Sequence, residues 1–236
     1  MFMKIAILMG AAAHDKVKYY INQLEKGTNF VEIGACNPPR PGSSTHTLFE
    51  IVNSHECKLY SVDPNEERMS LLPQMLPDVY SSDNFEMVNK TGEQFFDEYW
   101  KTGNKPISYI YMDGFDWMYN PIQYRLDPNS FTQKQQHEQY LEYKAEGIEL
   151  SNLNSSASHL KQTIKAEPLM NEKSIILFDD TFWVPEHEVY VGKGGSSVTY
   201  LISKGWEIIP FNTDGLLYPH LAVMLGKNIK TKKSLI

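Results

Sequence analysis

The sequence has few cysteines, no long apolar run and no basic cluster apart from the lysines of its last stretch, Lys227, Lys230, Lys232 and Lys233. Cys36 and Cys57 are the two cysteines, too few for a disulfide framework, which favours a reducing cytoplasm. The apolar stretch 5–13 superficially resembles a short signal peptide, but a first strand or helix turn is the simpler interpretation, and no run approaches the ~20 residues of a membrane span. Acidic residues outnumber basic ones, 29 to 22, so nucleic acid is disfavoured as a partner and membrane binding is not expected.

Length and composition suit one enzyme-like domain. Hydrophobic residues make up 42% of the 236 residues and charged residues 22%, as in globular proteins rather than disordered or membrane-spanning ones. No internal repeat and no linker divides the chain, so we expect a single domain over 1–236. The sequence leaves a homo-oligomer open.

Apolar segments alternate with helical patterns along the chain. This alternation predicts an α/β fold with a Rossmann-like, doubly wound and mostly parallel sheet of seven strands, including an antiparallel strand at one edge. The predicted strands are 29–34, 58–62, 85–89, 107–112, 174–178, 206–211 and 220–226. The predicted helices are 16–26, 43–53, 94–100, 155–166 and 196–203. Residues 115–160 break the rhythm, and because a structureless loop that long is unusual, we expect an inserted lid there.

Acidic residues stand at or next to the ends of four predicted strands. They are Glu32, Asp63, Asp113 and the pair Asp179 and Asp180. Ligands of doubly wound sheets bind just beyond the carboxyl ends of the strands. Carboxylates are also rarely placed in a parallel core without a partner. These strand ends are therefore the candidate functional site.

The glycine pattern after the first strand disfavours a dinucleotide cofactor. The Gly-x-Gly-x-x-Gly motif would need glycines at positions 34, 36 and 39, where the chain has Gly, Cys and Pro. Instead, Glu32 precedes Gly34 by two residues, and Gly42 with Ser43 opens the next helix after a loop several residues longer than usual. This pattern resembles the first motif of the class I S-adenosylmethionine (SAM)-dependent methyltransferases.

The resemblance implies a set of SAM contacts. The glycine turn would let the backbone approach the methionine part of SAM, and Asp63 would accept hydrogen bonds from the ribose hydroxyls, although Asp63 before Pro64 is also typical of a turn. Glu93 resembles a residue of the family's adenine-side loop, with a plain acidic helix N-terminus as the alternative. The implied cofactor-binding residues are Glu32, Gly34, Gly42, Ser43, Asp63 and Glu93.

The ends of the fourth and fifth strands sharpen the resemblance. Tyr-Met-Asp113-Gly and Phe-Asp179-Asp180-Thr resemble the metal-ligand positions of magnesium-dependent O-methyltransferases, including catechol and macrocin-type sugar enzymes. Magnesium prefers carboxylate and other oxygen ligands, so the resemblance implies that these three acids bind Mg²⁺. The alternative is that Asp113 caps a turn and Asp179 anchors the acceptor without metal.

The expected reaction is methyl transfer from SAM to a hydroxyl oxygen of a small-molecule acceptor. Catechol-type enzymes carry a lysine base shortly after the strand-four aspartate, a position where this chain lacks lysine, so Asp113 or Asp116 is the candidate catalytic base. A metal-independent N- or C-methyltransferase and a non-catalytic SAM-binding protein are the alternatives.

A glycine-rich segment, 192–195, precedes the last predicted helix. It lacks the Gly-x-x-x-x-Gly-Lys-Ser/Thr order of a phosphate-binding loop. We therefore expect a flexible lid or acceptor loop.

Overall fold

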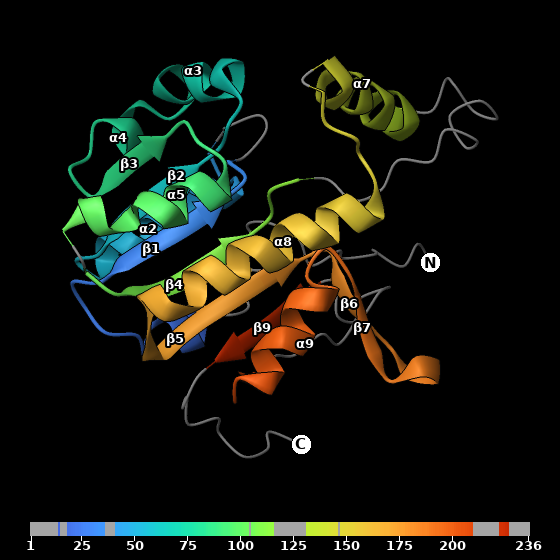
Figure 1. Ribbon diagram of the computed structural model, residues 1–236. Coiled ribbons are helices and arrows are strands. Elements are labelled where there is room, and N and C mark those ends of the chain that lie inside the picture. Colours follow the sequence, from blue (N-terminus) through green and yellow to red (C-terminus); the bar gives the residue numbers. More distant parts are fainter. Residues whose placement is uncertain are drawn as a thin grey trace, which may run out of the picture.

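A central sheet organises the computed structural model, which describes residue 14 and residues 18–35, 41–103, 105–115, 131–145, 147–209 and 222–226. The strand order is β3-β2-β1-β4-β5-β9-β8 (Figure 1). Five neighbouring strands run parallel to one another: β1 (Asn29–Ile33), β2 (Lys58–Val62), β3 (Phe85–Val88), β4 (Ile107–Met112) and β5 (Met170–Asp179). An antiparallel pair, β9 (Ala222–Gly226) and β8 (Glu207–Ile208), extends the sheet beyond β5.

The predicted doubly wound, mostly parallel architecture is confirmed, and the last two predicted strands form an antiparallel pair at one edge of the sheet. Of this pair, β9 also pairs with β5, and the two-residue β8 forms the border. Strand order reverses between β1 and β4, which are hydrogen-bonded neighbours. The carboxyl ends of these two strands therefore form the switch point where such folds bind ligands.

Helices cover both faces of the sheet. The helices α5 (Gly92–Glu98), α8 (Asn152–Ala166) and α9 (Gly195–Ser203) lie across the near face in Figure 1. The helices of the opposite face include α2 (Ser44–Ser54), α3 (Glu66–Met75) and the short α4 (Pro77–Tyr80). The central strands β1 and β4 are thus buried on both faces along their whole length, which explains their largely apolar sequences.

The two cores follow the alternation of side chains along the strands. On β4, Tyr109 and Tyr111 pack into the core with α2, whereas Ile110 and Met112 pack into the core with α5, α8 and α9. All four side chains are fully buried. The strand therefore leaves its polar chemistry to the residues that follow Met112.

Several elements differ from the predicted pattern. The helices α3, α4 and α7 (Phe131–Ala145) and the separate hairpin of β6 (Thr181–Val184) and β7 (Val189–Gly192) had no clear periodic signal in the sequence. Of the helix predicted at 16–26, residues 18–21 are helical. The remaining elements are the short helices η1 (Tyr99–Thr102), η2 (Glu167–Leu169) and η3 (Pro185–His187).

The helix α8 begins three residues before the predicted start. Ser151 caps it by accepting a hydrogen bond from the Asn154 backbone nitrogen at 3.2 Å. Ser155 and His159 in its first turns are fully buried. Residues 152–160 are therefore part of the helical layer on the sheet, although they had been grouped with the lid. Within the described residues, no helix has the length and apolar character needed to cross a membrane.

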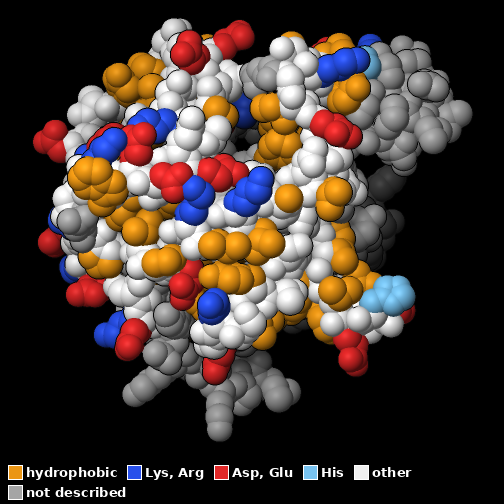
Figure 2. All heavy atoms as spheres, in the orientation of Figure 1, with side chains coloured by type: hydrophobic (Ala, Val, Ile, Leu, Met, Phe, Trp, Pro, Cys, Tyr) orange, Lys and Arg blue, Asp and Glu red, His pale blue; other side chains and the backbone are white. Residues whose placement is uncertain are grey.

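The visible face carries charges of both signs. Figure 2 shows acidic and basic side chains interspersed over α5 and α8, without a broad basic area. One of these pairs, Lys165 with Asp97, joins the two helices.

Candidate functional site

Glu32 lies inside the protein at the end of β1. Its side chain is fully buried and accepts hydrogen bonds from three hydroxyls, at 2.9 Å from Ser44, 2.8 Å from Thr45 and 2.7 Å from Ser61. Burial raises the pKa of Glu32 to about 7, although these three donors act in the opposite direction. Glu32 thus fastens the start of α2 to the strands, and any effect it has on a cofactor passes through the segment that it holds.

Gly34 forms a close backbone contact between β1 and the end of β4. Its φ is +89°, and a Cβ atom there would lie 2.6 Å from the Gly114 nitrogen. The Asp113 nitrogen donates to the Ile33 carbonyl at 2.9 Å, so the strands β1 and β4 stay in register up to this point. Only glycine fits position 34, and the switch point is closed by backbone rather than by side chains.

Gly42 and Ser43 form the entrance to α2. Gly42 has a φ of +77°, and among the described residues no atom lies within 4 Å of the position a Cβ would occupy. Ser43 is the N-cap, and its side chain accepts from the His46 backbone nitrogen at 3.4 Å. The glycine therefore serves the turn, while the serine starts the helix.

Asp63 directly follows β2. Its carboxylate accepts from the Asn65 backbone nitrogen at 2.9 Å and forms an ion pair with Arg68 at 3.2 Å. Burial raises its pKa, while Arg68 and backbone hydrogen bonds, including one from Ala35, lower it. The Ala35 contact places Asp63 beside the turn that contains Gly34, so the structure brings these two predicted residues together.

Glu93 contacts the neighbouring helix. In the first turn of α5, its carboxylate accepts from Ser158 at 2.9 Å and from Gln162 at 3.1 Å, both on α8. Thr91 caps α5 in a reciprocal capping box with Gln94. The Glu93 side chain thus braces two helices, and the structure does not show it grouped with Asp63.

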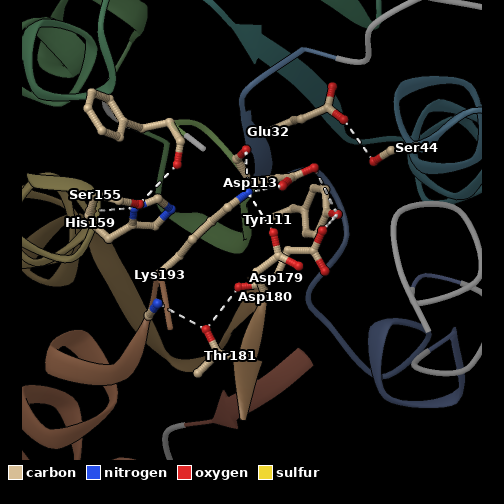
Figure 3. A network of polar contacts seen from close by, with 12 residues as sticks. Glu32, Ser44, Tyr111, Asp113, Ser155, His159, Asp179, Asp180, Thr181 and Lys193 are labelled. Atoms are coloured by element: carbon tan, nitrogen blue, oxygen red, sulfur yellow. Dashed lines mark hydrogen bonds and ion pairs between the residues drawn. The ribbon is translucent and has the colours of Figure 1, made fainter. Parts of the chain in front are cut away.

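Asp113, Asp179 and Asp180 converge at the ends of β4 and β5, and we call them the three-Asp centre. One carboxylate oxygen of each lies within 4.8 Å of those of the other two. The Tyr111 hydroxyl lies 3.0 Å from Asp179 Oδ2 and 3.3 Å from Asp113 Oδ2. The predicted convergence of these residues is therefore observed (Figure 3).

Lys193 enters the three-Asp centre and was missed by the sequence interpretation. Its Nζ lies 2.8 Å from Asp113 Oδ1 and 3.1 Å from Asp180 Oδ2, and 2% of its side chain is exposed. The glycines on either side of Lys193 were a signal for a close backbone approach, but they were interpreted as a sign of flexibility. The segment predicted to be a flexible lid or an acceptor loop is held by two hydrogen bonds, from Lys193 N to the Asp180 carbonyl and from Gly194 N to the Thr181 hydroxyl, at 3.1 and 2.9 Å.

Two buried polar atoms of this region lack partners among the described residues. They are Asp179 Oδ1 and His159 Nε2. The other nitrogen of His159 pairs with the Ser155 carbonyl at 2.9 Å, and Figure 3 shows the imidazole beside the Lys193 side chain. Burial lowers the pKa of His159 to about 4, and the nearby Lys193 charge acts in the same direction.

The acids of the centre strongly perturb one another. Burial raises the pKa of Asp179 well above its usual value, and the charges of Asp113 and Asp180 raise it further, while Lys193 lowers it. Asp180 also has a φ of +44°, an uncommon backbone conformation for a residue with a side chain. Crowded carboxylates, backbone strain and unpaired atoms together are typical of a functional site.

Comparison with known proteins shows what architecture this is. No protein-family model matches the chain, and no curated protein matches it at a significant level. The structure is similar to an rRNA methylase from Streptococcus thermophilus, with a TM-score of 0.50, 13% identity and coverage of 94% of this chain and 99% of that one. It is also similar to a candidate caffeoyl-CoA O-methyltransferase from Staphylococcus aureus, with the same TM-score and identity, over 94% of this chain and 85% of that one.

The chain has the class I methyltransferase fold. In this methyltransferase fold, the predicted site residues divide between two neighbouring regions of the sheet. Glu32, Gly34 and Asp63 lie at the ends of β1 and β2, and the three-Asp centre lies at the ends of β4 and β5. Asp116, the second candidate base, lies outside the described residues.

Proposed function

We propose that this protein is a SAM-dependent methyltransferase that methylates a hydroxyl oxygen of a small acceptor. One observation carries the proposal: Asp63 and the three-Asp centre stand at the carboxyl ends of strands on opposite sides of the switch point between β1 and β4. Donor and acceptor would then meet over the backbone contact at Gly34. The fold supports the methyl donor, and the clustered acids support an acceptor whose proton must be removed.

In the proposed arrangement, the turn at Gly34, the α2 entrance at Gly42 and Ser43, and Asp63 hold SAM. Glu32 acts by fastening α2, and Glu93 acts from the start of α5. Asp63 already accepts hydrogen bonds, so SAM ribose hydroxyls would exchange with Arg68 for the same carboxylate. Because the Asp63 carboxylate is buried, a bound molecule has to offer it hydrogen-bond donors. The two ribose hydroxyls do so, which gives selectivity for the ribose.

The reaction is an in-line displacement. The acceptor oxygen forms a bond to the methyl carbon while the carbon–sulfur bond breaks, and the sulfonium becomes a neutral thioether. The hydroxyl proton goes to a base, for which we propose Asp113 or Asp116. Asp113 is suited to this role because its side chain is 29% exposed, the largest exposure in the three-Asp centre. Alignment of donor and acceptor would supply most of the rate.

A magnesium-assisted version of the reaction follows from the resemblance to metal-dependent enzymes. The three carboxylates and the unpaired Asp179 Oδ1 are suitable oxygen ligands. The arrangement as a whole does not fit a bound cation, however, because the Lys193 ammonium already contacts Asp113 and Asp180. We therefore assign no step to a metal.

We further propose that residues 1–236 act as one domain in which the part of 115–160 preceding α8 covers the acceptor. The Phe115 ring, just after β4, lies 5.1 Å from the Tyr143 ring of α7. Figure 1 shows α7 separate from the helical layer on the sheet. Limited proteolysis should then cleave this segment in the free protein, and SAM with acceptor should protect it. Equal protection in both states would contradict a lid.

Calorimetry with SAM, its demethylated product and NAD tests the cofactor. We expect micromolar-range binding of the first two and none of NAD, and Asp63→Ala should weaken SAM binding by about tenfold or more, since the ribose loses its acceptor. Asp78→Ala, an exposed carboxylate on α4, is the matched control. Binding of NAD but not SAM would refute the assignment.

Turnover assays with deuterated-methyl SAM then separate the alternatives. Hydroxylated small molecules, amines and ribosomal RNA are offered, and mass spectrometry locates the label. Label on oxygen supports the proposal. Label only on nitrogen or carbon, or only in RNA, would contradict it, and SAM binding without transfer to any acceptor would support a SAM-binding protein without catalysis.

A further inference from the structure

Lys193 is one of the most deeply buried charged side chains in the described part of the chain. Its relative exposure is 1%, yet it lies in a short connection between β7 and α9. A buried ammonium is unfavourable unless it is paired. Its Nζ is paired with Asp113 Oδ1 and Asp180 Oδ2, and it also lies 3.4 Å from the Asp113 carbonyl oxygen.

The backbone around Lys193 is built to hold it in place. The preceding Gly192 has a φ of +93°, and a Cβ atom there would lie 2.0 Å from the Asp180 carbonyl oxygen. Only glycine permits this contact, and the same carbonyl accepts the Lys193 backbone hydrogen bond. The lysine and the acids it pairs with are thus fixed to one another through the backbone as well as the side chains.

We propose that Lys193 is the resident cation of the three-Asp centre, so that this centre binds no divalent metal and Lys193 positions Asp113 and Asp180 for the acceptor. The proposal rests on the proposed function and departs from it at one point, the metal that the resemblance implies. A magnesium ion binds carboxylate oxygens at about 2.1 Å. It would bind the same two carboxylates that the ammonium contacts at 2.8 and 3.1 Å, and the two positive charges would repel each other.

Lys193 supplies a positive charge to the three-Asp centre, but buried polar atoms around it still lack hydrogen-bond partners. Asp179 Oδ1 and His159 Nε2 have no partner among the described residues, and both lie around the lysine in Figure 3. Buried polar atoms normally have hydrogen-bond partners. These two atoms therefore point to a polar ligand, which in the proposed function is the acceptor rather than a metal ion.

Electron paramagnetic resonance with Mn²⁺ tests the proposal on the full chain. We expect no bound Mn²⁺ signal at the centre of the wild type and no thermal shift with Mg²⁺. Lys193→Met removes the charge and leaves an unbranched side chain one atom shorter, and we expect it to bind Mn²⁺ at least about tenfold more tightly than wild type. The double variant Lys193→Met with Asp180→Asn is the matched control, and it should lose this gain.

Each outcome decides the proposal. Wild-type binding of Mn²⁺ that Asp180→Asn abolishes would overturn it, and so would a folded Lys193→Met variant that gains no Mn²⁺ affinity. If Lys193→Met does not fold, Lys193→Gln replaces it, and the wild-type arm stands alone if neither folds. SAM binding is measured on the same samples, so a failed metal prediction with intact SAM binding leaves the proposed function in place.

Discussion

The two acidic regions of the site, at the ends of β1 and β2 and at the ends of β4 and β5, compensate their buried carboxylates in different ways. Glu32 is fully buried, and three neutral hydroxyls satisfy its two oxygens. Asp179 is just as buried, and the Tyr111 hydroxyl donates to one of its oxygens, but the charged groups around it are two further acids and one lysine, and its other oxygen has no partner among the described residues. The first arrangement is complete without a ligand, and the second is not.

This difference in how the buried carboxylates are compensated indicates which region is expected to react. Neutral donors stabilise a buried carboxyl and fix the segments that carry them, here α2 and β2. A crowded set of charges stores repulsion that one ammonium offsets only in part. In the proposed function, the ends of β1 and β2 form a rigid support for the methyl donor, and the ends of β4 and β5 form the reactive half.

Removal of the lysine charge should have the largest effect. Lys193→Met leaves buried carboxylates without their counter-charge, so we expect it to lower the free energy of unfolding by about 3 to 5 kcal/mol at neutral pH. Adding Asp180→Asn should restore part of this loss, because it removes one of the uncompensated charges. Urea denaturation of the two single variants and the double variant measures this coupling. Additive losses would show that the lysine does not offset the repulsion.

The backbone contact between the two regions should be the next most sensitive point. Gly34→Ala combines an unfavourable φ with a backbone overlap, and we expect a loss of about 3 to 4 kcal/mol. Gly42→Ala has a similar φ but open space, so it should cost only about 1 kcal/mol. Chemical denaturation of both proteins compares them. Equal losses would mean that the contact with Gly114 is not tight.

Glu32→Gln should remove a pH dependence that belongs to the β1 side. Because the pKa of Glu32 rises from 4.5 to about 7 on folding, the folded protein holds more protons than the unfolded one in this window. The free energy of unfolding of wild type therefore falls as pH rises through it. From the low end of the window to the high end, the free energy of unfolding of the variant should rise relative to that of wild type by on the order of 2 to 3 kcal/mol. This is an upper range, because the glutamine also changes three hydrogen bonds.

Stability curves of both proteins from pH 4 to 8 test this slope. The difference between the two curves isolates Glu32, because the three-Asp centre is common to both. A difference that does not vary with pH would show that Glu32 titrates near its ordinary value.

Glu93→Ala should have the smallest effect, since it lies outside both regions. It removes two side-chain hydrogen bonds between α5 and α8, and we expect a loss of about 1 kcal/mol. Thermal unfolding measures the loss, and SAM calorimetry on the same protein tests the proposed adenine-side role. Glu98→Ala, which removes exposed ion pairs at the other end of α5, is the control.

The alternation of strands and helices and the acidic strand ends could be predicted from the amino-acid sequence. Both follow from local patterns: apolar runs bounded by turn residues predict the parallel strands, and Asp113 and Asp179 follow two of those runs directly. Since parallel strands end at the same edge of a sheet, the convergence of the three acids could be predicted as well.

The hydrogen-bond and ion-pair partners of each acid became visible only in the folded structure. Lys193 follows Asp113 by 80 positions along the chain, and no local pattern shows that its ammonium ends beside that carboxylate. Glu32 accepts hydrogen bonds from α2 and β2 and lies in a closed buried network. Glu93 accepts hydrogen bonds from the neighbouring helix α8. The physical reason is that strand position is set by residues close in sequence, whereas burial and charge pairing depend on segments that meet only when the chain has folded.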